Sequence, residues 1–138
     1  MASVRVLALD IGTVRIGAAV SDALGITAQG LGVWQAETWH EDFAGAVAKY
    51  HPGIVVVGLP LRTDGKPSEA AERVSGIVEA LRNEYTGIEF VLQDERFTTV
   101  IAQRAMIEAD MSRRKRRKNI DKVAAVIILE DWLESHRR

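Results

Sequence analysis

Two apolar runs joined by a four-residue turn open this sequence and constrain its fold more than any other feature. Residues 4–10 and 16–21 have the composition of buried strands, and residues 12–15 between them are few enough for a hairpin. Strands joined by so short a connection pair in antiparallel fashion. Residues 26–34, loosened by two glycines, follow as a third and weaker strand. The sequence therefore predicts an antiparallel meander of three strands.

After residue 40 the pattern changes to helices that alternate with strands. The helices show apolar residues at helical spacing, and the strands show continuous apolar runs of the kind that is buried on both faces. The expected elements, in chain order, are a helix at 40–50, a strand at 54–60, a helix at 68–85, a strand at 88–95, and helices at 98–109 and 120–135. The predicted fold class is α/β, with one domain at residues 1–138 that contains a five-stranded mixed sheet flanked by helices.

The composition excludes several classes of protein. Of the 138 residues, 47% are apolar and 27% are charged, which is ordinary for a soluble globular protein. There is no cysteine, so disulfides, zinc–thiolate sites and thiol chemistry are excluded. The first residues lack the features of a signal peptide, and no segment approaches the roughly 20 apolar residues of a membrane span. We expect a cytoplasmic protein that has no membrane partner.

The positive charge is concentrated in one block. The net charge is only −1, but residues 113–118 are six consecutive cations, and subtracting their charges leaves −7 on the rest of the chain. Neutralising several phosphates gives strong, salt-sensitive binding that is independent of base sequence. This block is therefore expected to contact nucleic acid, although a solvated loop that adds solubility is the alternative. Its members are Arg113, Arg114, Lys115, Arg116, Arg117 and Lys118.

Four acids stand where an apolar element disfavours charge. Asp10 ends the first strand, Asp94 and Glu95 end the fifth, and Asp121 lies in the first turn expected for the last helix. Helical steps from Asp121 lead to two alanines and to Ile128, so this acid is expected to face the sheet. In sheets with helical crossovers, sites form at the carboxyl ends of the strands. The pattern favours a site at which these carboxylates converge.

Local structural roles could also explain each acid by itself. Asp10 could stabilise a turn, Glu95 could pair with Arg96, and a helix dipole favours Asp121 at a helix start. Carboxylates that gather at one place repel each other unless a hard divalent cation, Mg²⁺ or Mn²⁺, binds between them. Two such ions are suited to the hydrolysis of a phosphodiester by water. The acids therefore point to metal-dependent cleavage of nucleic acid.

The sequence resembles the YqgF family, also called RuvX, of ribonuclease H-like proteins. The resemblance rests on four segments in the family's order, and it spans residues 5 to about 134: DIGTVRIGAAVSD, VVVGLPLRTDG, DERFTT and IDKVAAVIIL. It implies a ribonuclease H-like sheet and an acidic site for two Mg²⁺ or Mn²⁺ ions. The family's catalytic and metal-binding acids fall on Asp10, Glu95 and Asp121, with Asp94 and Gly12 in supporting positions.

Further cations are candidates for contact with nucleic acid. Arg15 and Arg96 lie within a few residues of the proposed ligands, and Arg62 and Lys66 lie in a loop expected at the rim of the site. A surface salt bridge is the alternative for the two arginines near the acids. For the loop, turn formation at Pro60 and at residues 64–65 needs no ligand.

The resemblance implies a nuclease, for which two substrates remain open. The family is described as nucleases that process the 5′ end of pre-16S ribosomal RNA and as Holliday junction resolvases. Structured RNA, with ribosomal precursor particles as its setting, and branched DNA are the corresponding partners, and the protein would be a monomer or a homodimer. A non-catalytic nucleic-acid-binding module is a further alternative. The segment DIGT also looks like the phosphate-binding turn of sugar kinases and actin, but those proteins bind nucleotide between two such domains.

Overall fold

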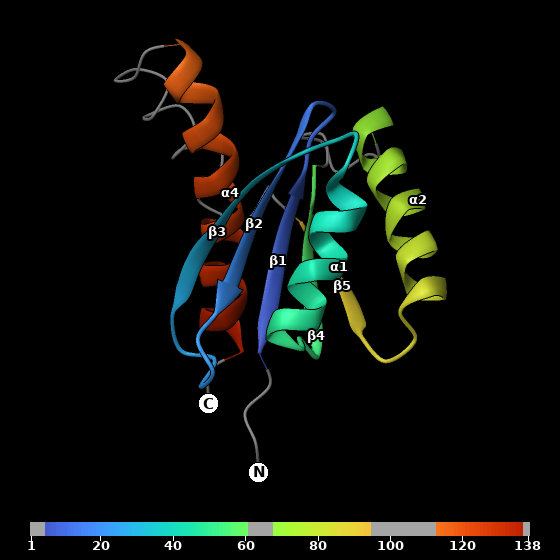
Figure 1. Cartoon of the computed structure of the whole chain (residues 1–138), viewed down its shortest axis with the longest axis vertical. Coiled ribbons are helices and arrows are strands. Elements are labelled where there is room, and N and C mark those ends of the chain that lie inside the picture. The colour runs from blue at the N-terminus through green and yellow to red at the C-terminus, as the bar shows by residue number, and fades with distance from the viewer. Residues whose placement is uncertain (1–4, 61–67, 95–112, 137–138) are drawn as a thin grey trace.

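The computed structural model describes residues 5–60, 68–94 and 113–136, and for residues 113–123 it describes the backbone alone. Within these ranges the elements follow the predicted order (Figure 1). They are β1 (Val6–Ile11), β2 (Arg15–Ser21), β3 (Ala28–Gln35), α1 (Trp39–Tyr50), β4 (Ile54–Leu59), α2 (Glu69–Glu84), β5 (Glu89–Asp94) and α4 (Arg113–Ser135). The helix predicted at residues 98–109 lies outside the described residues.

The five strands form one mixed sheet in the order β3-β2-β1-β4-β5. The first three strands pair in antiparallel fashion, as their short connections require. β4 is parallel to β1, and β5 is parallel to β4. The chain enters β4 through α1 and β5 through α2, and parallel strands need long connections of this kind. The carboxyl ends of β1, β4 and β5 therefore lie at the same edge of the sheet.

Helices cover both faces of the sheet. In Figure 1, α1 and α2 lie in front of the sheet and α4 lies behind it. The residues of β1 alternate between these two environments: Leu7, Leu9 and Ile11 belong to the core under α1 and α2, whereas Val6 and Ala8 pack against α4. The same alternation explains why β1 and β4 read as continuous apolar runs in the sequence.

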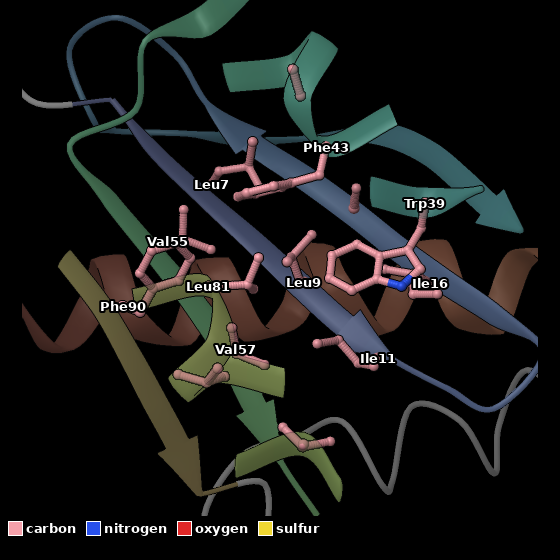
Figure 2. Packing of buried hydrophobic residues seen from close by; sticks show 14 residues of the cluster. Leu7, Leu9, Ile11, Ile16, Trp39, Phe43, Val55, Val57, Leu81 and Phe90 are labelled. Atoms are coloured by element: carbon pink, nitrogen blue, oxygen red, sulfur yellow. The ribbon is translucent and has the colours of Figure 1, made fainter. Parts of the chain in front are cut away.

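The larger side chains fill the core on the α1 and α2 face. Figure 2 shows Phe43 of α1 beside Leu7 of β1 and Trp39 of α1 beside Leu9, and all four are buried. The ring of Phe43 also meets Tyr85 edge-to-face, with 5.2 Å between ring centroids. The α4 face has smaller residues, among them four buried alanines, two of which belong to α4 itself, so this helix approaches the strands closely.

The predicted start of the last helix was wrong. α4 begins at Arg113, seven residues before the predicted start, and it includes the whole basic block. The prediction followed the apolar periodicity, which begins near Ile120. Arginine and lysine are good helix formers, however, and residues 113–119 contain neither glycine nor proline. The backbone of the basic block is therefore helical and is not a loop.

None of the helices within the described ranges is both long enough and apolar enough to cross a membrane. α4 has the necessary length, but its first turns are the six cations.

Candidate functional site

Asp10 lies on the α4 face of the sheet, one residue before the end of β1. The alternation along β1 places it with Val6 and Ala8, and its side chain is half-buried. Its partner in β2 is Gly17. On the other side, Leu9 pairs with Val57 of β4, so the next residue of β4, Gly58, lies beside Asp10.

Both strands next to Asp10 therefore have a buried glycine beside it. Neighbouring strands are about 5 Å apart, so any larger residue at either position would place its side chain against the carboxylate. In the same row, Gly58 pairs with Gln93 of β5. The residues directly beside Asp10 in both neighbouring strands therefore have no side chain.

The helix that covers this face carries Asp121. The backbone of α4 places Asp121 three and four residues before Ala124 and Ala125, which are fully buried against the sheet. Gln93 holds the helix to the sheet, because its Nε2 donates to the carbonyl oxygen of Ile128 at 3.1 Å. By helical spacing, Asp121 falls on the face of α4 that is turned toward the sheet.

The true start of α4 removes the dipole explanation for Asp121. The dipole stabilises acids within the first turn only, and Asp121 is the ninth residue of the helix. The first turn contains no acid and consists of cations, which the dipole disfavours at this end. The helix dipole therefore does not account for an acid at position 121.

Asp94 does not share the face of Asp10. In β5, Phe90 and Leu92 pack into the core under α1 and α2, and alternation places Asp94 on that same face, opposite Leu59 of β4. Gln93, one residue earlier, contacts α4. The side chain of Asp94 therefore lies on the opposite face of the sheet from that of Asp10. Glu95, the next residue, lies outside the described residues and remains a prediction.

The donor chemistry fits a hard divalent cation as far as the structure describes it. Asp10 supplies carboxylate oxygens, which are the ligands that Mg²⁺ and Mn²⁺ prefer, in a position with glycine on either side. Within the described ranges no three acidic, histidine or cysteine side chains gather closely enough to hold a metal ion. The side chains of Glu95 and Asp121 are not among them.

The turn after Asp10 is tight and requires a glycine. The backbone N–H of Gly12 donates to the carbonyl oxygen of Arg15 at 2.9 Å. A Cβ atom at position 12 would lie 2.6 Å from that oxygen, which is too close. A glycine is therefore required here on steric grounds, and the supporting role of Gly12 at the site remains a prediction. Among the residues that the structure describes, Arg15 forms no ion pair, so the salt-bridge alternative has no partner there.

The ends of the predicted rim loop are tied together by Ser68. Its hydroxyl caps α2 by accepting from the N–H of Ala71 at 3.1 Å, and it donates to the carbonyl oxygen of Pro60 at 2.9 Å. Arg62 and Lys66 lie between these ends, outside the described residues, as does Arg96. Their contacts with nucleic acid remain predictions.

Sequence reasoning missed four residues around Asp10. Gly17, Gly58 and Gln93 share its row across the sheet, and Arg73 of α2 donates to the carbonyl oxygens of the two residues that follow Asp10. Counting residues along the predicted hairpin could have found Gly17. No sequence signal identifies the other three, because their positions depend on pairing between distant segments.

Comparison with known proteins identifies the family to which this chain belongs. A family model described as "RuvX: Holliday junction resolvase" matches residues 4–135. The chain belongs to the RuvX family. It is 46% identical to a "Putative pre-16S rRNA nuclease" from Halalkalibacterium halodurans, over 94% of this chain and 96% of the relative. A protein of the same name from Myxococcus xanthus is 44% identical, over 96% of this chain and 89% of the relative.

Solved structures show the same fold. Thermus thermophilus RuvC, in complex with a Holliday junction substrate, matches with a TM-score of 0.60 and 16% identity over 95% of this chain and 94% of RuvC. A second RuvC structure from that organism matches with a TM-score of 0.54 and 14% identity, over 95% of each chain. The ribonuclease H-like fold is therefore confirmed. The chain is a member of a family of nucleases, enzymes that hydrolyse phosphodiester bonds.

Proposed function

We propose that this protein is a divalent-metal-dependent nuclease that processes the 5′ end of pre-16S rRNA, with Asp10, Glu95 and Asp121 as the metal-binding catalytic acids. One observation carries the proposal most directly: Asp10 lies between Gly17 and Gly58 on the face covered by α4, the helix that carries Asp121. Glu95 follows Gln93 by two positions in the sequence and lies outside the described residues, so its part in the site rests on the resemblance to the family.

Each part of the chain then has a defined task. Mg²⁺ or Mn²⁺ ions bound by these acids would activate water and neutralise charge on the phosphate. The backbone at Asp10 is paired with strands on both sides, which would limit how far its carboxylate has to move during the reaction. The two glycines beside it add no side chain that would compete with the ions and the phosphate for space.

The basic block is proposed to grip the nucleic acid backbone. Residues 113–118 form the first turns of α4, which in Figure 1 extend past the β1–β2 hairpin. Six cations at the positive end of a helix repel each other and oppose its dipole, each at a cost of a few tenths of a kcal/mol or more. Phosphates bound there would remove this cost. Arg15, at the hairpin, would extend the contact toward Asp10.

The substrate assignment rests on the relatives, which are named for pre-16S rRNA. The alternative is a Holliday junction resolvase, because the family model carries that description and RuvC was solved with such a substrate. A resolvase cuts two strands symmetrically and so needs a two-fold dimer, whereas a processing nuclease can act as a monomer. Action on pre-16S rRNA would place the protein in the cytoplasm, beside ribosomal precursor particles.

The test compares wild-type protein with Asp10→Asn on precursor rRNA and on a four-way DNA junction, in Mg²⁺ and in Mn²⁺. Glu89→Gln is the matched control, because Glu89 is an exposed acid at the amino end of β5, away from Asp10. We expect cleavage of the RNA by the wild type and by the control, and a loss of at least about 100-fold in Asp10→Asn with binding retained. Calorimetry with Mn²⁺ should show weaker binding in that variant alone.

Other outcomes would redirect or end the proposal. Cleavage of the junction alone, by a dimer, would establish the resolvase. Binding that persists in a chelator, with no cleavage in either metal, would identify a non-catalytic module. Undiminished cutting by Asp10→Asn would remove the proposed site.

A further inference from the structure

The side chain of Arg73 extends from α2 to the carboxyl end of β1. Its Nη2 donates to the carbonyl oxygen of Ile11 at 3.3 Å, and its Nη1 lies 3.5 Å from that of Gly12. These residues are 62 and 61 positions away along the chain, so the contact joins two distant segments. The guanidinium is half-buried, and among the described residues it has no carboxylate partner.

The two acceptors are the peptide groups that immediately follow Asp10. Ile11 is the last residue of β1 and still pairs with Ile16, whereas Gly12 begins the turn that its N–H closes on Arg15. Regular sheet pairing therefore ends at the point where Arg73 binds. A planar guanidinium can hold two neighbouring carbonyl oxygens at once, which the single ammonium of a lysine does less well.

Arg73 acts on the side of the sheet opposite to the carboxylate. Ile11 packs into the core under α1 and α2, so its side chain and its carbonyl oxygen are both held from that side. Asp10, the residue before it, is on the α4 face. Anchoring the peptide groups after Asp10 restricts rotation of the strand end about its own axis, and that rotation would move the carboxylate.

We propose that Arg73 is a positioning residue, which fixes the end of β1 and through it the direction of the Asp10 carboxylate. This inference rests on the proposed function for its catalytic consequence. A displacement of about 1 Å at a reacting group can reduce a rate by about 100-fold, so even a small release of the strand end would be measurable. The substrate itself need not touch Arg73.

The same helix provides a matched control at the other end of the sheet. Arg82, also on α2, donates through Nη2 to the carbonyl oxygen of Phe90 at 2.9 Å and pairs with Glu79. Phe90 lies at the amino end of β5, away from Asp10. Arg82→Gln therefore removes a comparable bond between α2 and a strand carbonyl without disturbing the end of β1.

The experiment compares Arg73→Gln, Arg73→Lys and Arg82→Gln by three measurements. Thermal unfolding reports stability, hydrogen exchange reports the backbone amides of residues 10–17 and 88–92, and steady-state kinetics on precursor rRNA report kcat and KM. We expect the two glutamine variants to lose similar stability. Only Arg73→Gln should speed exchange at the Gly12 amide and lower kcat by about 10- to 100-fold, with KM changed less than about twofold. Arg73→Lys should be intermediate.

The outcomes separate this inference from the proposed function. If the wild type cleaves but Arg73→Gln keeps full kcat and normal exchange at Gly12, Arg73 is not a positioning residue. A rise in KM alone would mean that Arg73 contacts substrate instead, and an equal loss of kcat in Arg82→Gln would reduce its role to general stability. If the wild type does not cleave, the proposed function has failed, and exchange at Gly12 still decides whether Arg73 holds the strand end. Should Arg73→Gln not fold, Arg73→Lys provides the same comparisons.

Discussion

Replacement of Gly12 by alanine tests the turn that follows Asp10. The added Cβ would lie 2.6 Å from the carbonyl oxygen of Arg15. That oxygen belongs to the backbone, so no side-chain rotation can relieve the contact. The turn must open instead, and the 2.9 Å hydrogen bond from the Gly12 N–H to the same oxygen is weakened or lost.

The expected destabilisation is the sum of two terms. Losing the hydrogen bond costs about 1 kcal/mol, and displacing packed backbone costs about 1–3 kcal/mol. The free energy of unfolding should therefore fall by about 2–4 kcal/mol. For a chain of this length, at roughly 3–4 °C per kcal/mol, the melting temperature should fall by about 6–16 °C.

Gly76→Ala is the matched control, and it should have the opposite sign. Gly76 lies within α2, and a Cβ atom there would meet nothing within 4 Å. Alanine is favoured over glycine in a helix by about 0.5–1 kcal/mol, so this variant should be more stable than the wild type. Urea and thermal unfolding followed by circular dichroism measure both changes.

Cleavage gives the second readout for Gly12→Ala. Asp10 is two residues before the altered turn, so the variant should cut precursor rRNA more slowly even at temperatures where it is fully folded. The reasoning is refuted if Gly12→Ala is as stable and as active as the wild type while Gly76→Ala shows the expected gain. The turn would then tolerate a Cβ, and glycine at this position would need another explanation.

Three further predictions concern the rest of the fold. Ser21 is buried and accepts a hydrogen bond from the N–H of Val6 at 2.8 Å, so Ser21→Ala should lower the free energy of unfolding by about 1–3 kcal/mol; an unchanged urea midpoint would contradict this. The backbone N–H of Ile26 lowers the pKa of Asp22 below its ordinary 3.8, so the stability this carboxylate contributes is present above pH 3.8 and is lost as the pH falls through its folded pKa. NMR titration should find that lowered pKa, and Asp22→Asn should differ in stability from the wild type at neutral pH but not in strong acid. Ala125→Leu should overfill the interface between α4 and the sheet at a cost of about 1–3 kcal/mol, and cleavage should slow in a folded variant because α4 is moved from Asp10; full activity would argue against that helix as part of the site.

Much of the fold follows from local patterns. The spacing of apolar residues locates the strands and helices, because an element that is buried on one face or on both faces has a characteristic hydrophobic pattern in its sequence. Ser68 was correctly predicted as a helix start, since its cap bond to Ala71 is formed within three residues. The start of α4 was missed because the apolar periodicity begins only near Ile120. The cations before it form a helix because arginine and lysine have high helix propensity.

The amino-acid sequence alone determined the α/β class, the order of the elements and the choice of Asp10, Glu95 and Asp121 as candidate acids. The tertiary structure decided which side chains surround Asp10. Gly17 and Gly58 lie beside it only because β2 and β4 pair with β1 in one particular register, and Arg73 reaches the strand end only because α2 packs across it. The register is set by the free energy of burying both faces of the sheet. This free energy depends on contacts between distant segments, so no single segment of the sequence determines it.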